Sequence, residues 1–195
     1  MLLKDKVVLV TGASGGIGKA AAIGCARHGA DVAINYHSDE AGAADAVREI
    51  EALGRRAIAV KGDVAEVATA QAFVDAAVAA FGRIDVFVNN AGICPFHAFL
   101  DMPPQVMERT MKVNLFGAYY MVQAAANQMV RQGDGGAIIA VSSISALVGG
   151  GMQTHYTPTK AGVHSLMQST AIALGKYGIR CNSCLLYTSP SPRDS

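Results

Sequence analysis

The 195-residue sequence contains no tryptophan, few charged residues and no long apolar run. Charged residues make up 16% of the chain and the formal net charge is +1, so there is no basic stripe of the kind that binds nucleic acid. No apolar stretch approaches the ~18–20 residues of a membrane-spanning helix, and the first residues lead into a strand-like run rather than a signal peptide. We therefore expect neither a nucleic-acid partner nor a membrane partner.

Cysteine is also scarce. The four cysteines, at positions 25, 94, 181 and 184, are scattered and suggest no disulfide framework. Cys181 and Cys184 have the spacing of half a zinc site, but no second pair exists, so we expect no metal site. A reducing cytoplasm is the simplest location for such a chain.

What the chain has in abundance is apolar and small residues, with a hydrophobic share of 51% and 21 glycines, in a length typical of one domain. Apolar strand-like runs alternate with segments of helical periodicity. Strands are expected at 6–11, 31–36, 56–61, 84–89, 136–142 and from 179, and helices at 16–28, 39–53, 65–81, about 103–131 and about 155–177. This alternation predicts right-handed βαβ units, and hence an α/β fold with a Rossmann-type doubly wound parallel sheet.

A glycine-rich turn, TGASGGIG at residues 11–18, lies between the first strand and the first helix. In this interpretation Gly12 permits the tight turn, Gly16 lets the backbone approach a pyrophosphate, and Gly18 lets helix and strand pack closely. The helix N-terminus then offers free N–H groups and a partial positive charge to phosphates. A glycine-rich turn by itself could be a flexible connection, but its place in a βαβ unit favours nucleotide binding.

Tyr156 and Lys160 are four residues apart and would share one face of a helix. Pro158 is tolerated only if that helix begins near Tyr156, which would put the phenol at the positive end of the helix. A tyrosine has a pKa of ~10, so a role as a base near neutral pH requires a fall of roughly three units. A neighbouring ammonium acts in that direction. The alternative is an ordinary surface pair.

Three further polar segments follow strands or interrupt a helix. Ser142 and Ser143 end the fifth strand, at the sheet edge where ligands bind in open α/β folds, and we expect Ser142 merely to cap the turn. The segment 89–92 (NNAG) follows the fourth strand at the same edge, although it could be a plain polar turn. Asn114 lies inside a helical stretch, where asparagine is a poor helix former and could be solvent-exposed.

Together these motifs make residues 1 to about 183 similar to the short-chain dehydrogenase/reductase family. The resemblance implies a sheet order of 3-2-1-4-5-6-7, use of NAD(P) and a homotetramer. It implies that Tyr156 is the general acid/base, that Lys160 lowers the pKa of Tyr156 and holds the nicotinamide ribose, and that Ser143 orients the substrate oxygen. Asn114 would hold a water that relays protons to Lys160.

The resemblance also implies which residues bind the cofactor. This set is Gly12, Ser14, Gly16, Ile17, Gly18, Tyr36, His37, Ser38, Asp63, Val64, Asn90, Gly92, Tyr156 and Lys160. NAD-specific members carry a carboxylate just after the second strand, and residues 35–38 contain none. Many NADP-preferring members carry a base where Gly15 stands. His37 could meet a 2′-phosphate, weakly at neutral pH, or could be an exposed loop residue. We expect dual use of NAD and NADP, with a slight preference for NADP.

On the substrate side, residues 89–103, 117–129 and 140–162 resemble sugar 1-dehydrogenases, which oxidise an aldose at its anomeric carbon to the lactone. Residues 144–153 carry no charge, as suits a neutral polar substrate. Gln153, Thr154 and His155 are candidate hydroxyl partners, although a structural role is the commoner one for each. The alternatives are a 3-oxoacyl-[acyl-carrier-protein] reductase and a non-catalytic dinucleotide-binding regulator, the latter disfavoured by the complete catalytic set.

The end of the sequence departs from the family. Members continue into a Pro-Gly turn, a further helix and a seventh strand, whereas this chain reads CLLYTSPSPRDS from residue 184. The string resembles one reading frame of a transposase sequencing adapter. We therefore interpret residues 1–183 as a truncated NAD(P)-binding Rossmann domain without strand seven and the last helices, and residues 184–195 as a non-native read-through tail that packs loosely. The full-length parent would be an active enzyme, and this chain would be poorly stable.

Overall fold

The computed structural model describes residues 1–187. Its strands are β1 (Val7–Val10), β2 (Asp31–Tyr36), β3 (Ala57–Lys61), β4 (Val86–Asn89), β5 (Gly136–Ser143) and β6 (Ile179–Leu186). Its α-helices are α1 (Gly16–Arg27), α2 (Glu40–Ala52), α3 (Val67–Phe81), α4 (Pro104–Met111), α5 (Gly117–Gln132) and α6 (Thr157–Leu174). The strands and helices alternate along the chain, as the periodicity predicts.

The strands form one parallel sheet in the order β3-β2-β1-β4-β5-β6, which confirms the predicted order of these six strands. The order reverses direction between β1 and β4, whose central pair is Leu9 opposite Phe87. In doubly wound sheets the crevice at such a reversal, beyond the carboxyl ends of the strands, is where ligands bind. The topology therefore places the glycine-rich turn after β1 and the NNAG segment after β4 on either side of that crevice.

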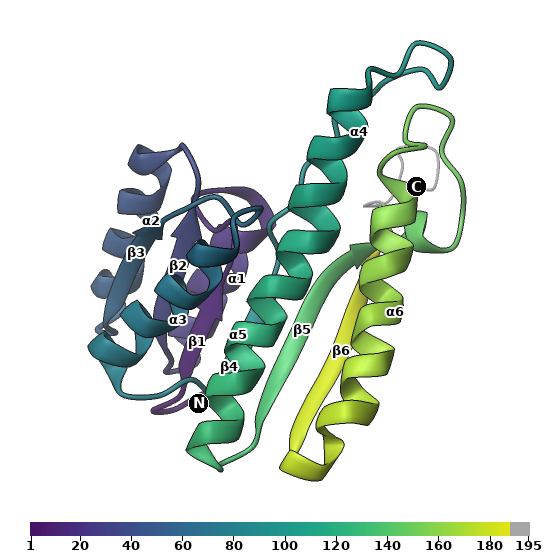
Figure 1. The fold of residues 1–195 in the computed structure, drawn as a ribbon. Coiled ribbons are helices and arrows are strands. Elements are labelled where there is room, and N and C mark those ends of the chain that lie inside the picture. Colours follow the sequence, from purple (N-terminus) through teal and green to yellow (C-terminus); the bar gives the residue numbers. More distant parts are fainter. Residues whose placement is uncertain (188–195) are drawn as a thin grey trace, which may run out of the picture.

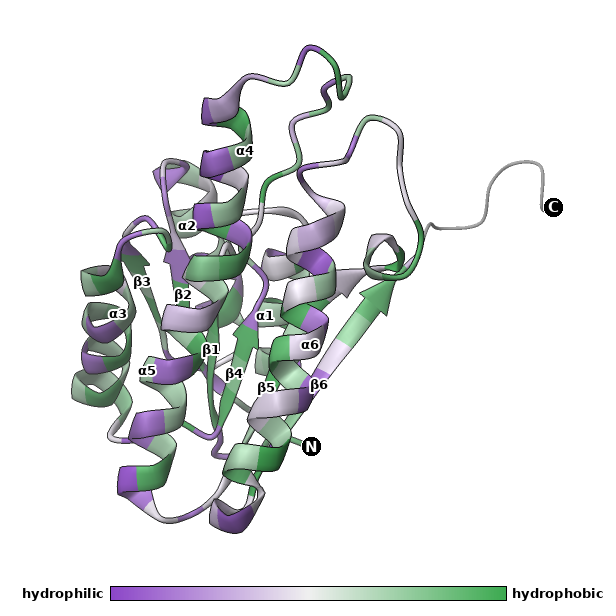
Figure 2. Cartoon of the chain, turned by 45° about the vertical axis from the view of Figure 1, so that its right-hand side comes forward, coloured by the Kyte–Doolittle hydropathy of each residue, from purple (hydrophilic) through white to green (hydrophobic). Residues whose placement is uncertain are grey.

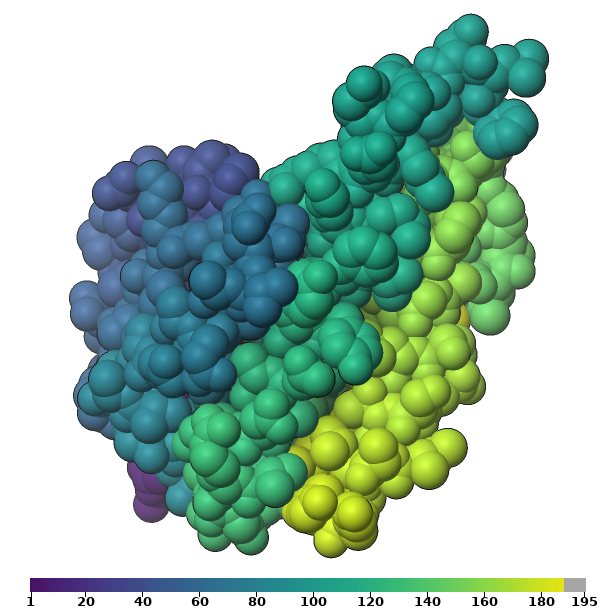
Figure 3. Space-filling view, in the orientation of Figure 1, coloured from purple at the N-terminus to yellow at the C-terminus, as the bar shows by residue number. Residues whose placement is uncertain are grey.

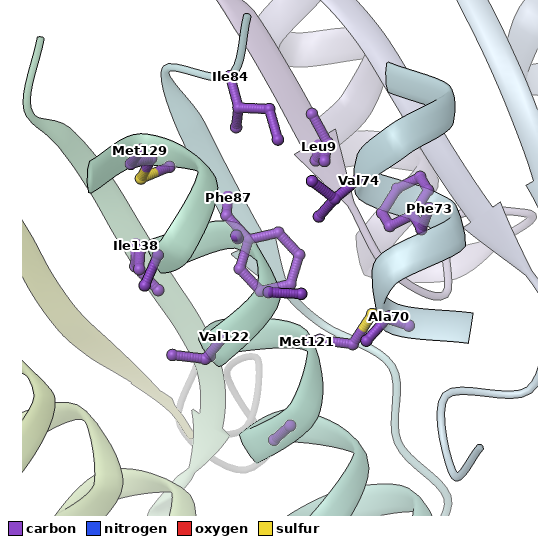
Figure 4. Packing of buried hydrophobic residues seen from close by; sticks show 14 of the residues in the cluster. Leu9, Ala70, Phe73, Val74, Ile84, Phe87, Met121, Val122, Met129 and Ile138 are labelled. Carbon is purple, nitrogen blue, oxygen red and sulfur yellow. The ribbon is translucent and has the colours of Figure 1, made fainter. Parts of the chain in front are cut away.

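Helices cover both faces of the sheet (Figure 1). One hydrophobic core joins the sheet to α1 and α2, and a larger one joins the opposite face to α3, α5 and α6. Figure 2 shows the hydrophobic central strands enclosed by helices whose outer surfaces are more polar. In Figure 4, Phe87 of β4 points between Val122 of α5 and Val74 of α3. Burial of a side chain of this size contributes about 1.5–3 kcal/mol, so these contacts hold the helices against the sheet.

The long helix expected at about 103–131 is divided. α4 ends at Met111, residues Lys112–Phe116 form a π-helical turn, and α5 begins at Gly117. Gly117 packs so closely on the β3–α3 connection that a Cβ would lie 2.8 Å from the carbonyl oxygen of Val64. A π-turn widens the helix at one point and frequently occurs at functional sites. Here the π-turn carries Asn114, and hydrophobic periodicity in the sequence cannot predict such a turn.

The C-terminal strand extends beyond the expected domain boundary at residue 183. β6 runs to Leu186, and Cys184, Leu185 and Leu186 pair with the last three residues of β5. The expectation of loose packing is therefore wrong for residues 184–186, because a parallel ladder is made by backbone groups and accepts almost any side chain. Tyr187 is exposed. Residues 188–195 of the predicted tail lie outside the described residues, and its origin stays a prediction.

Two loops extend beyond the carboxyl end of the sheet. Residues 93–103, before α4, project from the body in the space-filling view (Figure 3). The second loop connects β5 to α6, and the two are joined by a hydrogen bond from the amide of His97 to the carbonyl oxygen of Met152, at 3.2 Å. Both lie above the crevice and contribute to its walls. None of the helices in the described part of the chain has the length and apolarity needed to cross a bilayer.

Candidate active site

A cavity of about 490 Å³ lies at the carboxyl end of the sheet. Its lining residues come from the loops after the strands and from α4 and α6, so segments far apart in the sequence meet there. They include Gly12, Ser14, Ile17, Asn35, His37, Ser38, Asp39, Asp63, Val64, Asn90, Gly92, Cys94, Arg109, Ser143, Tyr156, Lys160 and Leu186. We call its three regions the glycine turn (Gly12–Gly18), the aspartate end (around Asp63) and the tyrosine end (around Tyr156).

The glycine turn is shaped by two close approaches. Gly12 has a φ of +63°, in the left-handed region, and a Cβ on it would lie 2.9 Å from the Cα of Ala91. A Cβ on Gly18 would lie 2.4 Å from the carbonyl oxygen of Gly12 and 2.5 Å from Nδ2 of Asn90. The same Asn90 amide donates hydrogen bonds to the carbonyl oxygens of Thr11 and Gly12. Gly18 therefore allows the close helix–strand packing that the spacing predicts.

Three members of the predicted cofactor set do not line the cavity. Gly18 is buried under the turn, and Gly16, with a φ of +54°, has open space where its Cβ would be. Tyr36 is 8% exposed and packs in the core with α1 and α2. Its placement follows from strand alternation, because Asn35 and His37 on either side of it line the cavity. The side chain of Tyr36 therefore points away from the cavity, and its membership of the cofactor set stays a prediction.

The tyrosine end confirms the helix register expected from Pro158. α6 begins at Thr157, with Tyr156 at the N-cap position and Pro158 in the first turn. Lys160 is 6% exposed, and its Nζ lies 5.5 Å from the centre of the Tyr156 ring and donates to the carbonyl oxygen of Val141 at 2.9 Å. The half-buried Tyr156 and the buried Lys160 therefore lie together in the cavity wall and are not an ordinary surface pair.

Burial controls the titration of this pair. It lowers the pKa of Lys160 from 10.5 to about 8, against a smaller opposing effect of the Cys94 thiol. It also raises the pKa of Tyr156, and the hydroxyl of Ser143 acts in the opposite direction. In the protein alone the net shift of the Tyr156 pKa is therefore upward, and the lowering by Lys160 and the helix N-terminus stays a prediction. The ammonium lies against the carbonyl oxygen of Val141, and desolvation of the phenolate is the larger effect.

The two serines divide their tasks differently from the expectation. Ser142 is 3% exposed and donates from its hydroxyl to the backbone carbonyl oxygen of Lys160 at 3.0 Å, so it fastens β5 to α6. Ser143 Oγ accepts from the amide of Ser145 at 3.1 Å and caps the following 3₁₀ turn. Ser143, and not Ser142, is the capping serine. Its hydroxyl also faces the cavity beside Tyr156.

Asn114 lies behind the cavity rather than on its wall. It is 1% exposed, which excludes the solvent-exposed alternative. Its Oδ1 accepts from the amide of Ile93 at 2.8 Å, and its Nδ2 donates to the carbonyl oxygen of Ile93 and to Oγ1 of Thr159. A Cβ on Gly92 would lie 3.3 Å from Asn114 Oδ1 and 3.5 Å from Lys160 Nζ. Asn114 thus joins the loop after β4 to α6 beside the lysine.

The aspartate end contains residues that sequence reasoning did not select. Arg109 of α4 places Nη2 2.8 Å from Oδ2 of Asp63, and His37 Nε2 lies 3.8 Å from the same oxygen. Asp39 also lines the cavity, one position beyond the segment in which a carboxylate was sought, and it caps α2 by accepting from the amide of Gly42. Only the tertiary structure could reveal Arg109, since α4 is far from β3 in sequence. Asp39 could have been noticed.

The candidate substrate-side residues form a second layer. Gln153 donates to Sγ of Cys94 at 3.5 Å and receives a hydrogen bond from Ser145, while Cys94 itself lines the cavity. His155 is 1% exposed, and neither ring nitrogen has a hydrogen-bond partner among residues 1–187. Thr154 is half-buried and, like Gln153 and His155, is not on the cavity wall. Cys94 therefore links these residues to the cavity, because it lines the cavity and accepts a hydrogen bond from Gln153.

The cavity fits an extended dinucleotide. The N-terminal N–H groups of α1 carry no side-chain cap, in contrast to those of α2, so they remain available to phosphate oxygens at the glycine turn. From there the cavity continues in one direction to Asp63 and Val64 and in the other to Ser143 and Tyr156. The adenosine half and the nicotinamide half of NAD(P) would then occupy the aspartate and tyrosine ends.

A family profile described as short chain dehydrogenase matches residues 6–190. The chain belongs to the short-chain dehydrogenase family. A curated relative from Sphingomonas sp. (strain SKA58), named L-rhamnose 1-dehydrogenase (NAD(P)(+)), is 76% identical over 184 residues, which are 94% of this chain and 72% of that protein. A 3-oxoacyl-[acyl-carrier-protein] reductase from Staphylococcus aureus (strain Mu50 / ATCC 700699) is 40% identical over 178 residues, which are 91% of this chain and 72% of that protein.

Among solved structures of the family, the short chain dehydrogenase from Mycobacterium paratuberculosis bound to NAD superimposes with a TM-score of 0.91. It is 32% identical and covers 94% of this chain and 72% of that one. That structure has NAD bound, so membership of the family and the shape of the cavity agree on the kind of cofactor. This chain is thus an NAD(P)-dependent dehydrogenase of the short-chain family.

Proposed function

We propose that the protein oxidises L-rhamnose at C1 to the aldonolactone and transfers the hydride to NAD(P). The observation that carries the chemistry is the meeting of Ser143, Tyr156 and Lys160 at one end of a cavity whose middle is the uncapped N-terminus of α1. The substrate is supported by the 76% identity to a protein named for this activity, against 40% for the carrier-protein reductase. The uncharged segment 144–153 also suits a neutral sugar.

In this proposal Tyr156 accepts the proton of the C1 hydroxyl while Ser143 holds the same oxygen. A bound nicotinamide would supply the hydride acceptor and a positive charge that favours the phenolate. Lys160 would hold the ribose next to the ring, and the proton would leave Tyr156 towards Lys160 and from there pass to solvent. Asn114 positions that lysine by joining the loop after β4 to α6. A general acid/base of this kind typically contributes ~10²–10⁴-fold in rate.

We propose that both NAD and NADP serve as cofactors. His37 lines the cavity and supports a contact with a 2′-phosphate, whereas Asp39 would repel one, so the slight preference for NADP remains a prediction. Michaelis constants for the two cofactors at the same sugar concentration test it. A lower Michaelis constant for NAD would show that the carboxylate of Asp39 outweighs His37.

The deciding experiment compares substrates. The purified chain, and a chimera carrying the C-terminal part of the Sphingomonas relative after Ser183, are assayed for formation of NAD(P)H with L-rhamnose. The alternative activity is measured in parallel, as the consumption of NADPH with acetoacetyl thioesters. We expect sugar oxidation to be the faster reaction. Faster thioester reduction would support the reductase, and cofactor binding without either reaction would support a regulator.

We further propose, from the family resemblance, a cytoplasmic homotetramer. All four cysteines are free thiols, as is usual in a reducing compartment. A groove between α5 and α6 is lined by Tyr119, Val122, Leu166 and Leu174, and Ile172 nearby on α6 is 85% exposed, which suits contact with a second copy. Light scattering coupled to size exclusion tests the assembly, and a monomer at all concentrations would contradict it.

A further inference from the structure

The ion pair between Arg109 and Asp63 connects two walls of the cavity. Arg109 belongs to α4, which follows β4, and Asp63 belongs to the loop that follows β3. Both side chains line the cavity at its aspartate end, and Arg109 Nη2 lies 2.8 Å from Asp63 Oδ2. The guanidinium therefore contacts the carboxylate within the cavity wall, although it comes from the other half of the sheet.

The carboxylate of Asp63 is held at both oxygens. Oδ1 accepts from the amide of Ala65 at 3.0 Å, and Oδ2 accepts from Arg109. Burial acts to raise the pKa of Asp63, but the Ala65 amide and the Arg109 guanidinium outweigh it and keep the pKa below its usual value. A carboxylate has about four lone-pair positions, so two remain for further donors. Asp63 is thus an ionised acceptor in a fixed orientation.

We propose that Arg109 is a positioning residue for the cofactor: it fixes the Asp63 carboxylate so that its free lone pairs receive the N–H donors of the adenine base. The proposal rests on the proposed function, which places the adenosine half of NAD(P) at the aspartate end. Arg109 acts through Asp63 and need not touch the ligand. His37 cannot replace it, because its Nε2 is 3.8 Å from the carboxylate and its side chain is 63% exposed.

A merely stabilising ion pair would behave differently. The Arg109 side chain is 40% exposed, and ion pairs of such exposure contribute little to folding stability. Removal of the guanidinium should therefore leave the melting temperature almost unchanged while weakening the binding of adenine-containing ligands. The size of the loss should be about two- to tenfold, which is the usual cost of ordering one side chain on binding.

The test is isothermal titration of the 195-residue chain with two halves of the cofactor, AMP and nicotinamide mononucleotide. Arg109→Gln should weaken AMP and leave nicotinamide mononucleotide unchanged. Arg109→Lys, which keeps the charge but not the planar fork, should recover part of the AMP affinity. Arg131→Gln, which removes an exposed arginine of α5 bonded to Gln128, is the matched control and should change neither ligand.

A double-mutant cycle shows whether Arg109 acts through Asp63. In an Asp63→Asn background, Arg109→Gln should cause no further loss of AMP affinity. A loss that persists there, or a much larger loss for 2′,5′-ADP than for AMP, would mean that Arg109 binds the ligand directly and would overturn the proposal. Unchanged AMP affinity in Arg109→Gln would overturn the positioning role of Arg109 but not the proposed function. A wild-type chain that binds neither AMP nor nicotinamide mononucleotide would overturn the proposed function as well.

Discussion

The glycine turn and the tyrosine end of the cavity are built by different means. The glycine turn is shaped by backbone groups and by the amide side chain of Asn90, and it depends on the absence of Cβ atoms at Gly12 and Gly18. The tyrosine end consists of side chains from β5, α6 and the π-turn, held by buried hydrogen bonds. The comparison teaches that phosphate binding and proton transfer use different groups, although Tyr156 and Lys160 are also proposed to contact the cofactor.

The largest expected effect is a loss of turnover caused by a substitution at the tyrosine end. Tyr156→Phe removes the proton acceptor and keeps the ring, so turnover should fall by ~10²–10⁴-fold or more while the dissociation constant of NADH stays within a few-fold. Steady-state rates and titration of NADH fluorescence measure the two quantities. Turnover close to that of the wild type would sink the assignment of Tyr156. A parallel loss of NADH binding would show that the two regions are not separable.

The next effect concerns the support behind the tyrosine end. Asn114→Leu keeps the volume but leaves the amide and carbonyl of Ile93 without their partner, so unfolding free energy should fall by about 2–4 kcal/mol. Chemical denaturation measures this loss. Asn127→Leu, at an exposed position of α5, is the control and should change stability by no more than about 0.5 kcal/mol. Equal effects of both substitutions would contradict a special role for the Asn114 hydrogen bonds.

The depressed pKa of Lys160 makes stability depend on pH. Below pH 8 the lysine is charged in both the folded and the unfolded state, and the folded state bears the full cost of burying the charge. Between pH 8 and 10.5 only the unfolded lysine still binds the proton, so this cost declines as pH rises. Relative to Lys160→Met, wild-type stability should therefore increase across this window, by up to about 3 kcal/mol at ~1.36 kcal/mol per pKa unit.

Denaturation of both proteins at several pH values from about 7, below the folded pKa of Lys160, to 10.5, its unfolded pKa, measures that difference. Lys4→Met, which replaces an exposed lysine, should follow the wild type throughout. A difference between wild type and Lys160→Met that stays constant, or that falls as pH rises, would show that burial does not depress the pKa of Lys160.

The smallest expected effects are changes in stability caused by substitutions in and near the glycine turn. Gly18→Ala forces a Cβ against the carbonyl oxygen of Gly12 and the amide of Asn90, and should destabilise the fold by about 1–3 kcal/mol and weaken NADH binding. Gly24→Ala lies in the same helix with nothing within 4 Å of the new Cβ, and should stabilise by about 0.5–1 kcal/mol. Thermal unfolding of both variants checks the prediction. A tolerated Gly18→Ala would contradict the close approach.

The sequence by itself determined the α/β class and the common sheet edge at which the glycine turn and Ser143 lie, and the family resemblance added the order of six strands and the roles of Tyr156 and Lys160. The class and the common edge follow from short-range signals, since strand and helix periods differ and parallel strands end at one edge. Three features were decided only by the tertiary structure: the π-turn at Asn114, the burial that raises the pKa of Tyr156, and the pairing of Arg109 with Asp63. Each depends on contacts between segments distant in sequence, and desolvation and ion pairing exist only once those segments have packed together.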